Sequence, residues 1–98
     1  MNEVMEAVIH GRVHGVGFRY FAQHEAIALG LTGWVANEPD GSVRCVAVGP
    51  RTTLEAFAER LRKGPPAAVV ARVELAWRPA SSQPFDSFHV RSGAHRGD

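Results

Sequence analysis

A short glycine-rich segment followed by an arginine is the part of the sequence best suited to hold an anion. Gly15 and Gly17 precede a predicted helix, and Arg19 lies in the first turn of that helix. Glycine permits backbone conformations in which consecutive N–H groups point to one side, and a helix N-terminus carries partial positive charge. Arginine adds a permanent charge with several donors. The segment therefore favours a phosphoryl-sized dianion; on local pattern alone, a tight strand-to-helix turn with Arg19 in solvent is the alternative.

Known nucleotide-binding motifs do not fit this segment. Tyr20 stands where the dinucleotide fingerprint needs its third glycine, and the sequence contains no Gly-Lys-Ser/Thr run of the Walker type. Residues 14–21 superficially resemble the octamer of RNA-recognition modules. That octamer belongs on a third strand, needs an aromatic residue where Val16 stands, and works with stacking rings that residues 7–9 do not provide. An RNA-binding module is therefore the weaker alternative.

Other residues with chemical potential have structural explanations. His10 and His14 would lie about 13 Å apart on a strand, which is too far to share one metal ion. Cys45 alternates with Val43 and Ala47 on one strand face, so we expect it in the core rather than as a reactive thiol. No metal and no cofactor are expected.

Length and composition indicate one small domain. The chain has 98 residues, of which 45% are hydrophobic and 21% charged, and chains divide into separate cores only beyond about 200 residues. A formal net charge of +1 provides no field that would collect nucleic acid or an anionic membrane. The single cysteine and the short apolar patches near the N-terminus indicate a cytoplasmic protein without a membrane span.

Hydrophobic periodicity and turn residues predict the order of helices and strands. Alternating and β-branched residues indicate strands, and apolar residues three and four positions apart indicate helices. The sequence predicts strands over 4–13, 31–37, 42–48 and 67–77, a short edge strand over 85–91, and helices over 18–29 and 52–63. Residues 1–91 are expected to form the single domain, followed by a flexible tail over 92–98.

Two finer expectations concern the second half of the chain. Thr52 and Glu55 have the spacing of a capping box, which would start the second helix. The strand over 67–77 alternates in polarity, so it should bury one face. That face is expected to consist of Ala71, Val73, Leu75 and Trp77.

The predicted order βαββαβ indicates an α+β fold, a ferredoxin-like split βαβ sandwich in which two helices cover one face of an antiparallel sheet. The first and second strands then run in the same direction and end at the same edge. Ligands favour the crevice beyond the carboxyl ends of parallel strands. The edge so defined brings Arg19 and Asn37 together as candidate functional residues.

Several blocks of sequence carry a resemblance to a known family. The blocks are GRVHGVGFR (11–19), GLTGWVAN (30–37), DGSV (40–43) and GPPA (64–67). At this spacing, and over roughly residues 4–91, the chain resembles the acylphosphatase family. The resemblance implies a hydrolase that cleaves acyl phosphates to a carboxylate and inorganic phosphate without metal or cofactor. Phosphate would then be both product and competitive ligand.

The resemblance also implies roles for individual residues. Arg19 would bind the phosphoryl group together with the backbone N–H groups of the segment formed by His14, Gly15, Val16, Gly17, Phe18 and Arg19. Asn37 would position the attacking water. These roles agree with the chemistry, because a carboxylate leaves without a general acid and the transition state mainly needs donors for its phosphoryl charge.

One residue departs from the family pattern. The family usually has glutamine at the position of His14. A neutral imidazole still donates one hydrogen bond, whereas a protonated one adds a charge beside the phosphate. We therefore hypothesise that His14 makes phosphate affinity depend on pH.

Two functional alternatives accompany the expectation of a monomeric enzyme that binds no nucleic acid and no membrane. One is an acylphosphatase-like module that binds phosphate without hydrolysis or serves a carbamoyl-phosphate pathway, as in hydrogenase-maturation proteins; the stand-alone length argues against the pathway role. The other is the RNA-binding module, which a salt titration with single-stranded RNA would test.

Overall fold

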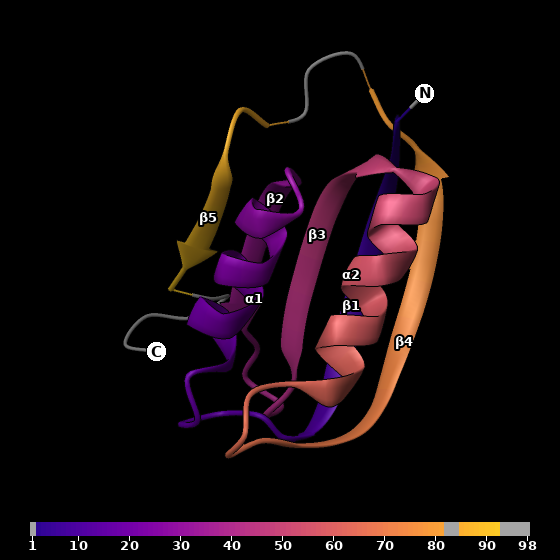
Figure 1. Ribbon diagram of the computed structural model, residues 1–98. Helices are drawn as coiled ribbons and strands as arrows, with labels where there is room; N and C mark the ends of the chain where they lie inside the picture. The colour runs from indigo at the N-terminus through magenta and orange to yellow at the C-terminus, as the bar shows by residue number, and fades with distance from the viewer. Residues whose placement is uncertain (1, 82–84, 93–98) are drawn as a thin grey trace.

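A computed structural model describes residues 2–81 and 85–92 (Figure 1). The elements, in chain order, are β1 (Asn2–Arg12), α1 (Phe18–Ala28), β2 (Thr32–Asn37), β3 (Val43–Pro50), α2 (Arg51–Lys63), β4 (Val69–Pro79) and β5 (Phe88–Arg91). Of the tail predicted over 92–98, residues 93–98 lie outside the described residues. Within the described ranges, no helix combines the length and the hydropathy needed to cross a membrane.

The strands form one five-stranded sheet in the order β4-β1-β3-β2-β5. The first four strands of this order pair with one another side by side in antiparallel fashion, and β5 joins at the edge by pairing with β2 in parallel. Both helices lie on the same face of the sheet (Figure 1). The predicted ferredoxin-like βαββαβ sandwich is confirmed, and the edge strand makes the sheet mixed rather than wholly antiparallel.

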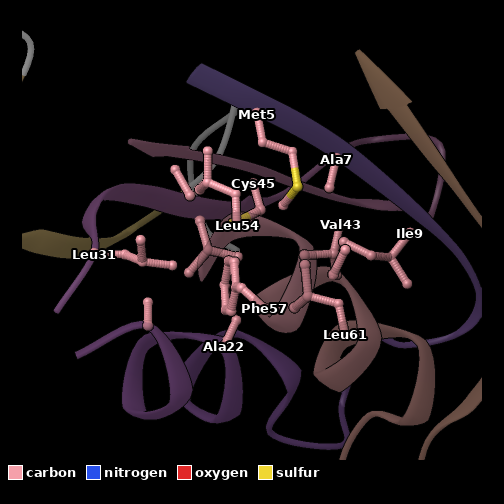
Figure 2. Close-up of a cluster of buried hydrophobic side chains, with 14 of the residues drawn as sticks. Met5, Ala7, Ile9, Ala22, Leu31, Val43, Cys45, Leu54, Phe57 and Leu61 are labelled. Carbon is pink, nitrogen blue, oxygen red and sulfur yellow. The ribbon is translucent and has the colours of Figure 1, made fainter. Parts of the chain in front are cut away.

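The core lies between the helices and the sheet. Buried side chains from β1 and β3 meet Leu54, Phe57 and Leu61 of α2 and Ala22 of α1 (Figure 2). The Phe57 ring also contacts the ring of Phe88 edge to face, with centroids 6.1 Å apart. This contact closes the core beneath the edge strand.

Cys45 lies in the middle of β3 and is fully buried, as predicted. Burial raises the pKa of its thiol, because the apolar surroundings disfavour the thiolate. Cys45 is therefore a core residue and not a nucleophile.

The opposite face of the sheet is partly covered as well. Val4, Val46 and Val48 form a second buried cluster there, against which Trp34 and Phe85 pack. The guanidinium of Arg91 lies 4.3 Å from the centre of the Trp34 ring. Burial on both faces explains why β3 is apolar along most of its length, since a central strand has no solvent face.

The predicted capping box at the start of α2 is wrong. The helix begins at Arg51, directly after the last residue of β3, and Pro50 occupies the cap position without a side-chain hydrogen bond. Thr52 therefore lies inside the first turn. The Glu55 carboxylate accepts a hydrogen bond from Arg51 Nε at 3.0 Å instead of reaching back to a cap.

The predicted buried face of β4 is correct except at Ala71. Pairing with β1 passes from His10 opposite Arg72 to Gly11 opposite Val70, so Ala71 is left out of the register. This bulge turns Val70 toward the core and leaves Ala71 exposed. Alternation alone does not reveal such an extra residue.

Strands β1 and β2 run in the same direction, since both are antiparallel to β3. The loop after β1 and the end of β2 consequently lie at the same end of the sandwich, where α1 also begins (Figure 1). The topology therefore brings together the segments that the sequence predicts to form the site, at one end of the strands.

Candidate active site

The turn that leads from β1 into α1, residues 14–17, is called the anion loop here. It is held by apolar side chains: Val13 and Phe18 at its ends are buried, and Val16 packs against the core from within it. Gly15 and Gly17 are exposed between these anchors, with φ values of 71° and 76°. Only glycine adopts this left-handed conformation without strain. The packed apolar residues thus hold the loop against the core, while the glycines between them leave its backbone exposed.

Helix α1 begins directly from the loop. Gly17 is its N-terminal cap and contributes no side-chain hydrogen bond. The N–H of Phe21 is bonded to the Gly17 carbonyl at 3.0 Å, which is the first turn of the helical ladder. The N–H groups of the residues before Phe21 have no carbonyl acceptor within the helix, because no helical turn precedes them. Because the first turn carries no acidic side chain, this end of the helix is suited to an anion.

A small pocket of about 170 Å³ lies where the loop, the helix and β2 meet. Arg19 and Asn37 both line it and both are half-buried. The complete lining consists of Val13, Gly15, Gly17, Phe18, Arg19, Tyr20 and Asn37. The volume suits a phosphoryl group and a water molecule rather than a whole cofactor.

The guanidinium of Arg19 is oriented by the edge strand. Its Nη1 donates a hydrogen bond of 2.9 Å to the carbonyl oxygen of Arg91 at the end of β5. A guanidinium carries five N–H donors in a planar fork and stays charged at any physiological pH. Arg19 can therefore be held by the protein and face an anion at the same time.

The structure brings together five of the predicted site residues and separates two. Gly15, Gly17, Phe18, Arg19 and Asn37 line the pocket. His14 and Val16 do not belong to this lining.

The ring of His14 points instead to the turn between β2 and β3, where Nε2 lies 2.8 Å from the carbonyl oxygen of Ser42. A carbonyl oxygen only accepts, so Nε2 carries the hydrogen. The side chain of His14 thus supports the loop from outside the pocket.

Two residues that line the pocket were not predicted from the sequence. Val13 is a buried residue directly after β1, and Tyr20 is exposed on the first turn of α1. The position of Tyr20, one residue after Arg19 at a helix start, is the signal that could have suggested it. Together with Val13 and Phe18, Tyr20 supplies apolar surface to the lining of the pocket.

The lining limits the chemistry that the pocket supports. Among the described residues that form it, the functional side chains are one guanidinium, one amide and one phenol. Such a set binds and orients charged groups but offers no carboxylate or imidazole as a base. A reaction with a good leaving group and water as nucleophile fits these residues.

The described histidines, cysteine and acidic residues do not gather in groups of three that could hold a metal. His10 bonds to Glu74 across β1 and β4 at 3.2 Å, and His14 bonds to Ser42. These two histidines therefore have separate structural partners.

The fold and the pocket together define a class: small α+β sandwiches in which an anion loop and an arginine at the start of the following helix meet at one end of the sheet. The family model Acylphosphatase matches residues 5–90. An acylphosphatase of Rhizobium etli is 46% identical over 85 residues, which cover 87% of this chain and 90% of that protein. One of Thermus thermophilus is 46% identical over 84 residues, covering 86% of this chain and 93% of that protein.

The solved structures agree with the family match. The crystal structure of acylphosphatase from Bacillus subtilis is 36% identical and superimposes with a TM-score of 0.86, covering 93% of this chain and 99% of that one. The chain belongs to the acylphosphatase family. It is an enzyme that hydrolyses acyl phosphates to a carboxylate and inorganic phosphate.

Proposed function

We propose that the pocket beside the anion loop is the active site, with Arg19 binding the phosphoryl group and Asn37 orienting the attacking water. The observation that carries this proposal is that both side chains line one small pocket together with Gly15 and Gly17. They reach it from α1 and from the end of β2, which are separated in sequence by the whole of the helix.

The backbone of residues 14–19 supplies the main part of the phosphate site. The N–H groups of His14, Gly15, Val16, Gly17 and Phe18 are proposed donors to the phosphoryl oxygens, along with those of Arg19. The left-handed glycines allow a close approach of the anion, and the start of α1 adds its dipole. These fixed donors stabilise the charge that spreads over the phosphoryl oxygens in the transition state.

Asn37 is proposed to act on water rather than on the substrate. Its amide cannot serve as a base at neutral pH, but it donates and accepts hydrogen bonds. It can hold a water in line with the bond that breaks. The P–O bond to the acyl group breaks as the water oxygen attacks phosphorus, and the proton of that water passes to a phosphoryl oxygen. The carboxylate departs without needing a proton.

The experiment is hydrolysis of benzoyl phosphate in the presence of a chelator, comparing wild type with Arg19→Ala and Asn37→Ala. By analogy with removal of one transition-state donor, each variant should lose at least about 10²-fold in kcat/KM. Arg19→Ala should also raise KM, since Arg19 contacts the ground-state phosphate, whereas Asn37→Ala should lower mainly kcat.

Matched controls are available in the chain. Arg62→Ala removes an exposed arginine of α2 that pairs with Glu59, and Asn2→Ala removes the exposed asparagine at the start of β1. Both should keep wild-type kinetics. Full activity in either Arg19→Ala or Asn37→Ala would refute the role assigned to that residue.

We further propose that residues 1–91 act as one monomeric domain in the cytoplasm, without metal and without nucleic acid. The small net charge of +1 supports the absence of nucleic-acid binding. Light scattering would test the monomer. Undiminished turnover in the chelator would support metal independence, and a salt titration with single-stranded RNA should give no binding.

A further inference from the structure

We propose that His14 is a positioning residue. Through a hydrogen bond to the carbonyl oxygen of Ser42, it sets the distance between the anion loop and Asn37, the residue proposed to orient water. The inference rests on the proposed function, because it assigns His14 a task within that site. It explains a side chain that lies next to the pocket without lining it.

One oxygen atom connects the two halves of the site. The carbonyl of Ser42 accepts a hydrogen bond from His14 Nε2 at 2.8 Å and another from the backbone N–H of Glu38 at 2.9 Å. His14 immediately precedes Gly15, and Glu38 immediately follows Asn37. The Ser42 oxygen is therefore bonded to a residue of the proposed phosphate-binding segment and to the residue that follows Asn37.

The acceptor itself is held firmly. Ser42 is 3% exposed, and both its N–H and its hydroxyl donate to Asp40 Oδ1, at 2.9 and 2.6 Å. Within the same turn, Gly41 N–H donates to the Glu38 carbonyl at 3.1 Å. The turn that follows Asn37 is thus closed by its own hydrogen bonds, and the ring of His14 attaches the anion loop to it.

Loss of this attachment should affect the reaction more than the binding of phosphate. A phosphate ion contacts the loop donors and Arg19, which all belong to one continuous segment. In-line attack also requires that Asn37 keep its place relative to that segment. Small misplacements of reacting groups lower rates strongly, so the effect should appear in kcat while competitive inhibition by phosphate stays nearly constant.

A double-mutant cycle between His14 and Asn37 tests this coupling. His14→Ala removes the donor, His14→Phe keeps a ring without it, and His14→Gln keeps an N–H donor on a flexible side chain. Each would be assayed with benzoyl phosphate alone and in the Asn37→Ala background, with phosphate inhibition measured in parallel. His24→Ala, which removes an exposed histidine of α1, is the matched control, and thermal unfolding confirms that each variant is folded.

His14→Ala and His14→Phe should each lower kcat about 10-fold, and His14→Gln should recover most of that loss. In the Asn37→Ala background, His14→Ala should change kcat less than about twofold, because the residue to be positioned is gone. At pH 8, phosphate inhibition constants should shift less than about threefold in all His14 variants.

The inference is overturned if the losses from His14→Ala and Asn37→Ala multiply, or if phosphate inhibition weakens as much as kcat falls. If either result is found while Asn37→Ala is inactive, the proposed function still holds and only the role of His14 is refuted. Undiminished turnover in Asn37→Ala alone would instead refute the role of Asn37 and this inference with it.

Discussion

Arg19 donates a hydrogen bond of 2.9 Å from Nη1 to the carbonyl oxygen of Arg91, the last residue of β5. In the parallel pairing of β5 with β2, Arg91 stands opposite Ala36, the residue before Asn37. The edge strand therefore holds the proposed phosphate ligand beside the residue proposed to orient water. A short strand at the sheet edge thereby contributes to the geometry of the site.

This contact predicts that lysine cannot replace Arg19. Arg19→Lys keeps the positive charge but replaces a planar fork by a single ammonium, which cannot match the guanidinium geometry toward both the Arg91 carbonyl and a phosphoryl group. We expect kcat/KM for benzoyl phosphate to fall about 10²-fold, close to the value for Arg19→Ala. Inhibition by inorganic phosphate would be measured alongside. A lysine variant with near wild-type kcat/KM would show that charge alone suffices.

The left-handed glycines predict a separation of stability from activity. Gly17→Ala and Gly30→Ala place a side chain at nearly the same φ, 76° and 75°, and neither new methyl group meets a neighbouring atom within 4 Å. Both should destabilise the fold by about 1 kcal/mol, measured by urea unfolding. Only Gly17→Ala should also weaken phosphate inhibition, since Gly30 lies at the other end of α1. Equal kinetics in the two variants would argue against the loop as the phosphate site.

His14 predicts a pH dependence of phosphate binding. Its ring donates from Nε2 in both the neutral and the protonated form, so the bond to Ser42 persists while protonation adds a positive charge beside the loop. The carboxylate of Asp40 accepts its hydrogen bonds from the N–H and the hydroxyl of Ser42, not from His14. We expect inhibition by inorganic phosphate to strengthen more in wild type than in His14→Gln as the pH is lowered from 8 to 5.5. Phosphate itself titrates in this range, but it does so equally for both proteins, so the comparison removes that effect. Identical profiles would refute the hypothesis.

Asp40 predicts a pH dependence of stability. Hydrogen bonds from the hydroxyl and the backbone N–H of Ser42 lower the pKa of this exposed carboxyl group in the folded protein. A lowered folded pKa gives stability that is fully present above the unfolded value and is lost as the pH falls through the folded value. The thermal midpoint of Asp40→Asn should therefore lie below that of wild type at pH 7, and the difference should shrink toward pH 2.

The control for Asp40 is the exposed Asp86. Asp86→Asn leaves the bonds between Asp40 and Ser42 in place, so it should keep the thermal midpoint of wild type at pH 7. A difference for Asp40→Asn that stays constant down to pH 2 would contradict the contribution assigned to the ionised carboxylate.

The sequence predicted the fold well because each main element carries a local signal. Phe18, Ala22 and Ala26 mark the buried face of α1, and all three are buried in the structure. The capping box failed because the chain passes from Pro50 straight into α2 without a separate cap residue. The bulge at Ala71 depends on pairing with β1, which alternation within β4 does not encode.

The site shows the same division between local and long-range information. Gly15, Gly17 and Arg19 form a local pattern, and topology adds Asn37. The bonds of His14 to Ser42 and of Arg19 to Arg91 span 28 and 72 positions in the chain. Contacts of this kind arise only when the sheet is assembled, so no local motif announces them.

Asn2 and the anion loop lie at opposite ends of β1 (Figure 1). An eleven-residue strand separates them by about 33 Å at the usual rise of a β-strand. Attachment of the enzyme to a solid support through its N-terminal side would therefore turn the pocket toward the bulk solution. This arrangement suits an immobilised reactor or an acyl-phosphate sensor, because the tether and the entrance for substrate lie at opposite ends of the molecule.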